Sequence, residues 1–466
     1  MISIRISRRQ IVSILTLIVI GGILRFYQIN HFHFDFDQQV PAEAAYDFFI
    51  NRKISLIGQE LSFPGFFLGP LFNWSQFIPY GLCQLKPDCI PYFSASVSLL
   101  VLIATYFLLK NIYGSKVSTI AVGIFAISSW QILFDLNPNS NFFVLLSSVL
   151  ILFTVNKYLS GDKKYFILGA FVSGLATVNF NPVFIFTTIA FFAVALLSLR
   201  KASVFLFLLA LVAFFVNYAP ILIFNFRHEN IIFNNMVQFI NQNTTAGIAK
   251  NPLVLISQII SPFYSNFLFF DDHYIYGKLV EIFAIALLII GVLKLNLRNK
   301  IEHSFLLVWI FFVTLGFLFY KGHIPEYYFI QILLPMVIII ATTLRNNIYL
   351  FLAFVLIFVF SNVQDIKSIK SFVNYQAKKK IVDYIISDTN GETFNVIYEV
   401  PLGFQTGYDY LFKIHNSHPQ EDGKNLYIIG VGEGAYTINR NYQQKFQTKE
   451  TKELKIKENV FVVSVK

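Results

Sequence analysis

The sequence predicts an α-helical polytopic membrane protein with about eleven transmembrane helices and a small extracytoplasmic α/β domain at its C-terminal end. Of the 466 residues, 56% are hydrophobic and only 13% are charged, whereas about a quarter of the residues in a soluble domain are charged. The mean hydropathy is +0.60, and the apolar residues form runs that are long enough to cross a bilayer. After residue 362 these runs shorten and alternate with polar turns, which predicts a separate domain.

The basic residues are interpreted as topology signals. The net charge is +10, but Lys and Arg are spread singly between apolar runs, which argues against a nucleic-acid partner. The first span, residues 11–27, follows three arginines and has no small-residue cleavage site, so we expect it to remain as a signal anchor. A window of about 20 residues places the later spans at residues 91–109, 117–134, 142–158, 166–182, 183–199, 204–224, 279–295, 304–320, 328–344 and 347–362.

The orientation follows from the loops. With the N-terminus inside, every inside loop contains Lys or Arg, for example Lys163, Lys164 and Arg345. We therefore expect a protein of the cell membrane, with a transmembrane domain at residues 1–362 and an outward domain at residues 363–466. The predicted outer segments within the first domain are residues 28–90, 135–141, 179–182, 225–278 and 321–326.

The C-terminal stretch reads as a small α/β domain. Apolar residues recur at helical spacing over residues 375–386, which predicts an amphipathic helix. Strand-like pieces at residues 395–400, 426–431 and 459–465 are separated by polar turns.

The start of the first outer loop carries the most informative polar residues. If this stretch is extended, His31, His33, Asp35 and Asp37 share one face, and the phenylalanines between them share the other. Three hypotheses follow. A carboxylate acts as a general base on an acceptor hydroxyl, the His and Asp side chains hold a divalent cation, or one Asp merely caps a helix. The helix is expected to begin near Pro41 and to lie on the membrane.

Further candidates lie in other outer segments. Arg227 is predicted to lie outside, where basic residues are rare, and its guanidinium suits a phosphate group. His228 and Lys321 are additional candidates, and a snorkelling or solvated side chain is the alternative for each. Cys83 and Cys89 are expected to form a disulfide, which an outside location permits.

Several motifs over about the first 345 residues resemble those of polytopic C-type (GT-C) glycosyltransferases. This superfamily includes protein O-mannosyltransferases and lipid A aminoarabinose transferases. The matching motifs are Arg25-Phe-Tyr, Phe36-Asp-Gln38, Leu56-Ile-Gly58, Gly65-Phe-Phe-Leu-Gly-Pro70, Ser128-Ser-Trp130, Asn137-Pro-Asn139, Phe224-Asn-Phe-Arg-His228 and Glu326-Tyr-Tyr-Phe329 with Pro335.

The resemblance implies that a sugar passes from a polyprenyl-phosphate carrier to a hydroxyl of a protein, lipid or glycan, usually with inversion. It implies that Asp37 is the base, with Asp35 in reserve, and that the lipid-linked sugar donor is a co-substrate, while no cofactor is certain. A divalent cation is left open, with His31, His33 and Asp35 as its candidate ligands. The implied substrate-binding residues are Gln38, Asn137, Asn139, Arg227, His228, Lys321, Glu326 and Tyr327.

The sequence departs from the bacterial pattern at two places. Val40-Pro41 stands where Arg-Asp is common, and Tyr327 stands where His is common, so the sugar and acceptor pocket is expected to differ. Two other classes of protein are alternatives. A secondary transporter or flippase would place ionisable residues near the middle of the membrane, where the spans here are nearly free of charge. A non-catalytic scaffold would tolerate replacement of Asp37.

Overall fold

The computed structural model describes residues 7–61, 65–197, 204–242, 254, 258–261, 263–268, 277–295, 301–319, 326–368, 373–401, 403–431, 451–457 and 460–465. Helices occupy most of the described residues of every predicted span. Among these residues, six helical stretches are long and apolar enough to cross a membrane, and one bent pair would make a seventh. The number of eleven crossings stays a prediction. The helices are α1 (Arg8–Tyr27), α4 (Ile90–Tyr113), α5 (Ser115–Ile127), α6 (Ser129–Leu136), α7 (Val144–Leu159), α8 (Lys164–Asn179), α9 (Ile185–Leu197), α10 (Val204–Phe215), α11 (Ala219–Arg227), α14 (Gly277–Lys294), α15 (Ile301–Leu318), α16 (Ile330–Leu344) and α17 (Ile348–Ser368).

The span predicted at residues 117–134 is not continuous. It consists of α5 and α6, which meet at Ser128 with a bend of 64°. Ser128 leaves the helical conformation, and its hydroxyl accepts a hydrogen bond from the Gln131 amide, as a capping residue does. The same hydroxyl donates to the carbonyl of Phe267 at 2.7 Å, which holds the bend against a distant segment.

A buried ion pair fixes the far end of this bent pair. The guanidinium of Arg25 on α1 is fully buried and donates to Asp135 at the end of α6 at 2.5 and 3.0 Å. It also donates to the hydroxyl of Ser98 and to backbone carbonyls of α1 and α5. Gln131 donates to the second carboxylate oxygen of Asp135 at 2.8 Å. Because both charges are paired and hydrogen-bonded, the pair is tolerated in an apolar interior.

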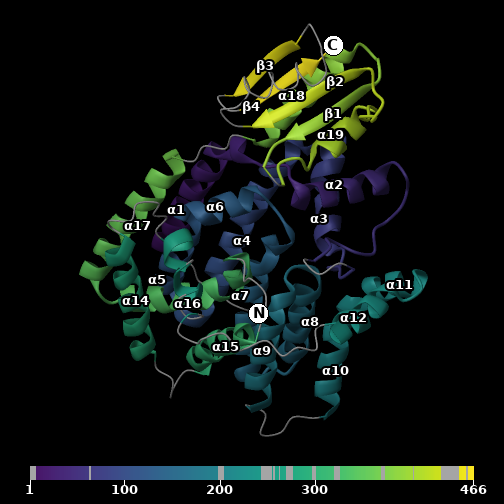
Figure 1. Ribbon diagram of the computed structural model, residues 1–466. Helices are drawn as coiled ribbons and strands as arrows, with labels where there is room; N and C mark the ends of the chain where they lie inside the picture. The colour runs from purple at the N-terminus through teal and green to yellow at the C-terminus, as the bar shows by residue number, and fades with distance from the viewer. Residues whose placement is uncertain are drawn as a thin grey trace.

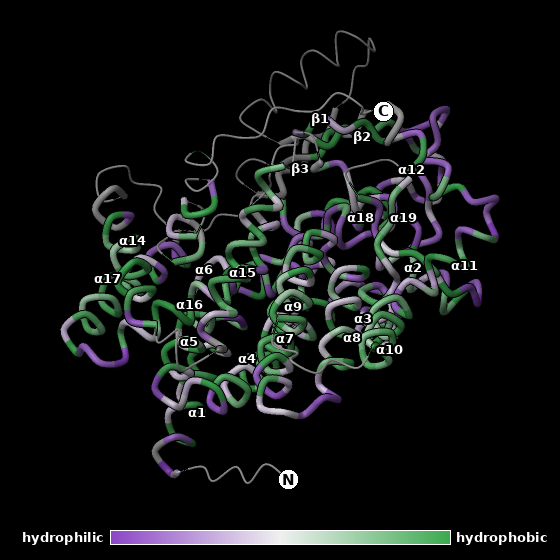
Figure 2. Tube along the Cα trace, turned by 90° about the horizontal axis from the view of Figure 1, so that it is seen from below, coloured by the Kyte–Doolittle hydropathy of each residue, from purple (hydrophilic) through white to green (hydrophobic). Residues whose placement is uncertain are grey.

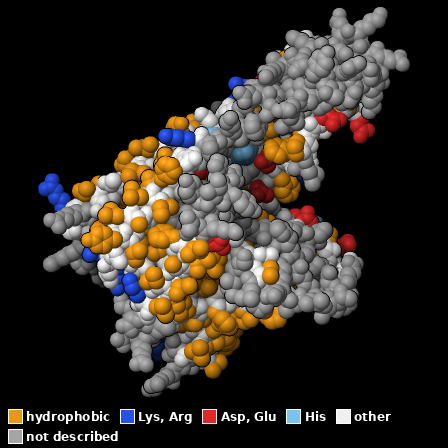
Figure 3. Space-filling model, turned by 60° about the vertical axis from the view of Figure 1, so that its left-hand side comes forward, with side chains coloured by type: hydrophobic (Ala, Val, Ile, Leu, Met, Phe, Trp, Pro, Cys, Tyr) orange, Lys and Arg blue, Asp and Glu red, His pale blue; other side chains and the backbone are white. Residues whose placement is uncertain are grey.

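The helical body has a buried centre and an apolar outer face. Every residue of α16 is buried, and the helix packs against α5, α7, α14 and α15. In contrast, the stretch from Val204 to Arg227 exposes large apolar side chains such as Phe226, which is 72% exposed. Figure 3 shows such side chains spread over one face of the molecule. A continuous apolar surface of this kind is suited to contact with lipid.

Residues 28–90, predicted from the sequence to be the first outer loop and called so below, contain two α-helices. Helices α2 (Phe36–Phe49) and α3 (Leu71–Leu82) pack against each other, and α3 leads to a disulfide between Cys83 and Cys89 with a Cα–Cα distance of 5.8 Å. Figure 2 shows that hydrophilic residues gather around α2 and α18, whereas α5 and α10 are mostly hydrophobic. In the segment predicted to be outside at residues 225–278, α12 (Ile231–Gln242) follows α11.

The C-terminal part forms a four-stranded mixed sheet with two helices (Figure 1). The strand order is β1-β2-β4-β3, with β1 parallel to β2 and the other neighbours antiparallel. The predicted helix and three strands are present, and α19 and β3 are additional. α17 continues past the predicted boundary at residue 362, so the division into domains stays a prediction. The elements are α18 (Tyr375–Thr389), β1 (Phe394–Glu399), α19 (Tyr408–Ile414), β2 (Asn425–Val431), β3 (Thr451–Lys457) and β4 (Val460–Val465).

One hydrophobic core joins the sheet to the first outer loop. Phe32, Phe34 and Tyr80 of the loop are buried together with Tyr410 and Tyr427 of the C-terminal part. Figure 1 shows the sheet resting directly above α2 and α3. Phe32 and Phe34 therefore pack in this core because the C-terminal part covers them, whereas Phe36 is 48% exposed.

Candidate active site

Asp37 lies in the first turn of α2, which begins at Phe36 and not at Pro41 as predicted. Asp35 is the N-cap residue, and its amide donates to the side-chain oxygen of Gln38 at 3.1 Å. Polar residues at these positions start a helix because they satisfy its free ends. The extended course over residues 31–37 is thus wrong, since it ends at Asp35, and Asp37 does not share a strand face with the histidines.

A glutamine side chain orients the Asp37 carboxylate. Gln59 donates from Nε2 to Oδ1 of Asp37 at 2.5 Å. Gln59 is held by a short antiparallel turn, in which Gly58 donates to Leu68 at 2.7 Å and Leu68 donates to Gln59 at 2.9 Å. Burial raises the pKa of the Asp37 carboxyl above its ordinary value, the Gln59 hydrogen bond lowers it, and the charge of Asp35 raises it.

Asp37 borders a cavity of about 120 Å³ at one end of the helical body. Four segments that are distant in sequence line it: the first outer loop, the α6–α7 connection, the α8–α9 turn and the segment before α16. Amide and aromatic side chains predominate among the polar and large lining groups. The lining residues are Asp37, Gln59, Glu60, Leu61, Leu68, Asn139, Ser140, Asn141, Phe180, Asn181, Pro182, Tyr327 and Tyr328.

Hydrogen bonds between the segments give this cavity a fixed shape. Asn181 donates from its side chain to Asn141 at 2.8 Å, which joins the α8–α9 turn to the α6–α7 connection. The amide of Gly69 donates to the carbonyl of Val178 at 2.8 Å, and that of Leu71 donates to Asn179 at 3.2 Å. These bonds join the first outer loop to the end of α8. The cavity is therefore assembled by tertiary contacts and not by any single motif.

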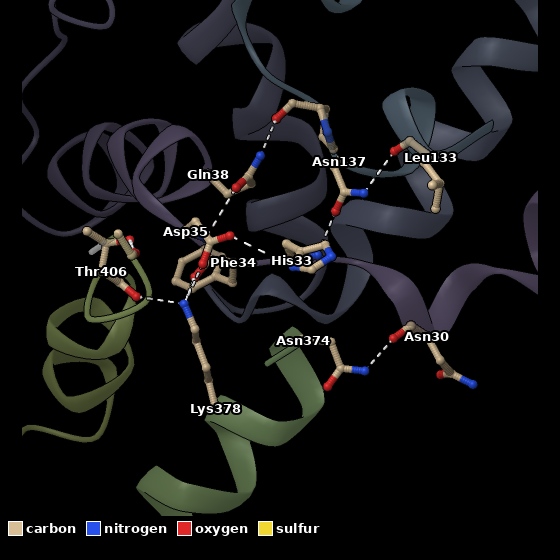
Figure 4. A network of polar contacts seen from close by, with 12 residues as sticks. Asn30, His33, Phe34, Asp35, Gln38, Leu133, Asn137, Asn374, Lys378 and Thr406 are labelled. Atoms are coloured by element: carbon tan, nitrogen blue, oxygen red, sulfur yellow. Dashed lines mark hydrogen bonds and ion pairs between the residues drawn. The ribbon is translucent and has the colours of Figure 1, made fainter. Parts of the chain in front are cut away.

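Asp35 has partners other than those of Asp37, and Figure 4 shows Asp35 between His33 and Lys378. Its carboxylate pairs with Lys378 of α18 at 2.5 Å and lies 3.8 Å from Nδ1 of His33. Asn137 accepts from the amide of His33 at 2.6 Å, and Gln38 donates to the carbonyl of Pro138 at 3.1 Å. Gln38 and Asn137 thus join the start of α2 to the α6–α7 connection, and they do not line the cavity.

Of the predicted cation ligands, only the neighbouring side chains of His33 and Asp35 are shown close to each other. His31 lies in a 3₁₀ turn, Ile29–His31, while Asp35 faces Lys378. In the part of the chain that the structure describes, no group of three His, Cys, Asp or Glu side chains is arranged to hold a metal ion. The four side chains do not share one strand face, because His31 lies in a 3₁₀ turn and Asp37 in α2, and the divalent cation stays a prediction.

Of the remaining site residues predicted from the sequence, some line the cavity and others do not. Asn139 and Tyr327 line the cavity. Arg227 and His228 are exposed at the end of α11, where the His228 ring stacks on Phe224 with centroids 4.0 Å apart, and neither lines the cavity. Lys321 lies outside the described residues, as does the side chain of Glu326, whose backbone begins a 3₁₀ turn.

Sequence reasoning missed several lining residues. Gln59 and Glu60 directly follow the Leu56-Ile-Gly58 motif, so proximity to a motif was the available signal. Asn141 and Asn181 lie in two short segments predicted to be outside, residues 135–141 and 179–182, but only the fold brings them together.

The comparisons with known proteins define the fold. No family model and no curated protein matches the chain. The chain is similar to the apo oligosaccharyltransferase of Archaeoglobus fulgidus, with 13% identity and a TM-score of 0.51, over 88% of this chain and 64% of that chain. It is also similar to ArnT from Cupriavidus metallidurans bound to undecaprenyl phosphate, with 12% identity and a TM-score of 0.47, over 97% of each chain.

The archaeal neighbour is a GT-C glycosyltransferase, and the likeness to it shows that this chain has the GT-C fold. The expected resemblance to that superfamily is confirmed at the level of the fold. The chain spans 64% of the length of the archaeal protein.

Proposed function

We propose that this protein transfers a sugar from a polyprenyl-phosphate donor to a hydroxyl acceptor at the outer face of the membrane, with Asp37 as the general base. The observation that carries the proposal is the cavity, in which a partly buried carboxylate meets amide and aromatic side chains within a GT-C fold. Amides donate to and accept from sugar hydroxyls, and aromatic faces pack on sugar rings.

The chemistry requires a base and a leaving group. The Asp37 carboxylate accepts the proton of the acceptor hydroxyl while that oxygen forms a bond to the anomeric carbon. The bond from this carbon to the carrier phosphate breaks, and the phosphate leaves with the electron pair. Attack from the face opposite the phosphate inverts the anomeric centre. Gln59 holds one oxygen of Asp37 and leaves the other to meet the hydroxyl.

The outer location is supported by charge. The cavity lies where α8 ends and α16 begins. Lys163 and Lys164 lie at the opposite end of α8, and Arg345 follows the opposite end of α16. Basic residues favour the cytoplasmic side, so the cavity belongs to the other side.

The donor class is proposed from the neighbours. The ArnT structure is bound to undecaprenyl phosphate, and we extend a polyprenyl-phosphate ligand to this chain. Arg227 is proposed as a contact for the phosphate on its charge alone, because it is exposed at a helix end. A divalent cation remains a separate prediction, with His31, His33 and Asp35 as its candidate ligands.

The test uses the full chain in proteoliposomes. Labelled polyprenyl-phosphate sugars are supplied with a mixture of hydroxyl acceptors, with and without a chelator, and transfer is compared with that of empty liposomes. We expect protein-dependent transfer from at least one donor. If no donor in a broad panel yields transfer or binds to the protein, the proposed function is wrong.

A further inference from the structure

One ammonium group of the C-terminal part reaches the start of α2. Lys378 on α18 has a side chain that is 0% exposed. Its Nζ donates to the carbonyl of Phe34 at 3.0 Å, to Oδ1 of Asp35 at 2.5 Å and to the carbonyl of Thr406 at 2.8 Å (Figure 4). An ammonium has three N–H groups, so all of its donors are used.

These bonds connect two ends of the chain. Lys378 and Asp35 are separated by 343 positions in the sequence. The Tyr408 ring lies 5.3 Å from Nζ and completes the surroundings of the charge. Because a buried charge is tolerated only when it is paired and hydrogen-bonded, Lys378 strongly favours this one arrangement.

The same region of α2 has two further contacts with the C-terminal part. The amide of Gly407 donates to the side chain of Gln39 at 2.7 Å, and Lys413 pairs with Glu43 at 2.5 Å. Gly407 has a φ of +88°, and a Cβ there would collide with the carbonyl of Phe34, so the two backbones touch. The C-terminal part thus contacts the segment that carries Asp37 through hydrogen bonds, ion pairs and a close backbone approach.

We infer that Lys378 is a positioning residue, which fixes the start of α2 and thereby sets the place and the electrostatic surroundings of Asp37. The consequence for catalysis rests on the proposed function, whereas the structural link does not. Asp35 is the N-cap residue of α2, and Asp37 lies in its first turn. A shift in the position of Asp35 therefore also shifts Asp37, because both residues belong to the same first turn of α2.

The charge effect has a defined direction. Asp35 is faced by Lys378 and by His33, and Asp37 is faced by Gln59, Tyr327 and Asp35, with Glu60 on the same cavity. Loss of Lys378 leaves the Asp35 charge without its nearest partner. The pKa of Asp37 then rises, so transfer requires a higher pH.

The test compares Lys378→Met with the matched control Lys379→Met. Lys379 is the next residue of α18 and pairs with Asp88 of the 3₁₀ turn Pro87–Cys89 at 2.8 Å. Hydrogen exchange of peptides covering residues 33–40 reports the start of α2, since the amides of Gln38 and Gln39 donate to the carbonyl of Asp35. We expect exchange roughly tenfold faster in Lys378→Met, the loss anticipated for a charged hydrogen bond, and no change in Lys379→Met.

The pH profile separates positioning from general damage. In Lys378→Met the rise of transfer with pH is expected to move to higher pH. In the double variant Lys378→Met with Asp35→Asn, the pH at which transfer rises is expected to return to the wild-type value or below. Hydrogen exchange of residues 33–40 is expected to stay fast in this variant. If Lys378→Met does not fold, the double variant is used in its place, because the double variant leaves no carboxylate unpaired at position 35.

The results of the Lys378 experiment can be distinguished from a failure of the proposed function. Unchanged exchange in Lys378→Met, or equal changes in Lys379→Met, would overturn the inference. If the wild-type protein shows no transfer, the proposed function fails, and the exchange measurement still decides the role of Lys378.

Discussion

The hydrogen bond from Gln59 to Asp37 gives a quantitative prediction for the variant Gln59→Leu. Leucine is similar in size but cannot donate to the carboxylate. The bond of 2.5 Å favours the ionised form of Asp37, and its loss raises the pKa of that group. A hydrogen bond to a charged group is worth about 1.5–3 kcal/mol, and a shift of one pH unit corresponds to about 1.4 kcal/mol.

Both side chains are only partly buried, so the lower end of this range applies. A base works when it is ionised, so transfer rises with pH through the pKa of Asp37. We therefore expect this rise to move upward by about one pH unit in Gln59→Leu. Gln59→Glu is expected to move it further, because a second carboxylate would face Asp37 at hydrogen-bond distance.

The assay is the rate of a single turnover from pH 5 to 9 with donor at saturation. The pH range is chosen to bracket neutral pH by about two units on each side. Donor binding is measured in parallel by displacement, so that a loss of affinity is not mistaken for a shift. A profile in Gln59→Leu that coincides with the wild-type profile would refute the role assigned to this hydrogen bond, and so would a shift to lower pH.

Three further predictions concern stability. Arg25→Leu or Asp135→Leu alone should lower the free energy of unfolding by about 3–5 kcal/mol, because each leaves a buried charge without a partner. The double variant should lose much less stability. Thermal midpoints in detergent measure these losses, and equal losses in all three variants would contradict the pairing. Gly407→Ala should lower the midpoint as well, since a left-handed residue with a side chain costs about 1–3 kcal/mol before the collision is counted, and an unchanged midpoint would show that the two backbones do not touch. Replacing Cys83 and Cys89 by Ser should cost about 2 kcal/mol from the freed loop, measured against the wild-type protein under reduction, where the difference should vanish.

The sequence predicts the helices of the membrane spans well, because each one is a long run of apolar residues and such runs rarely form other structures. It predicts the bend at Ser128 poorly, since a single hydroxyl within an apolar run gives no sign of the carbonyl that it contacts. β3 was missed because it has only two apolar residues, Leu454 and Ile456, which is too short an alternation to mark a strand.

The site shows the same limit. Asp37 was identified from its motif, but the role of Asp35 depends on Lys378, which is 343 positions away. Asp35 and Asp37 are only two positions apart, yet one caps α2 and the other faces the cavity. Local spacing describes a carboxylate pair, whereas only the fold assigns different partners to its members.

The central claim is that Asp37 removes a proton from the acceptor, and the measurement that tests it most directly is the rate of a single turnover in Asp37→Asn. The amide has nearly the same shape and accepts no proton. We expect the rate to fall by about 10²–10⁴-fold while donor binding is kept, and we expect Asp35→Asn to fall much less. Transfer at the wild-type rate by Asp37→Asn would contradict the account.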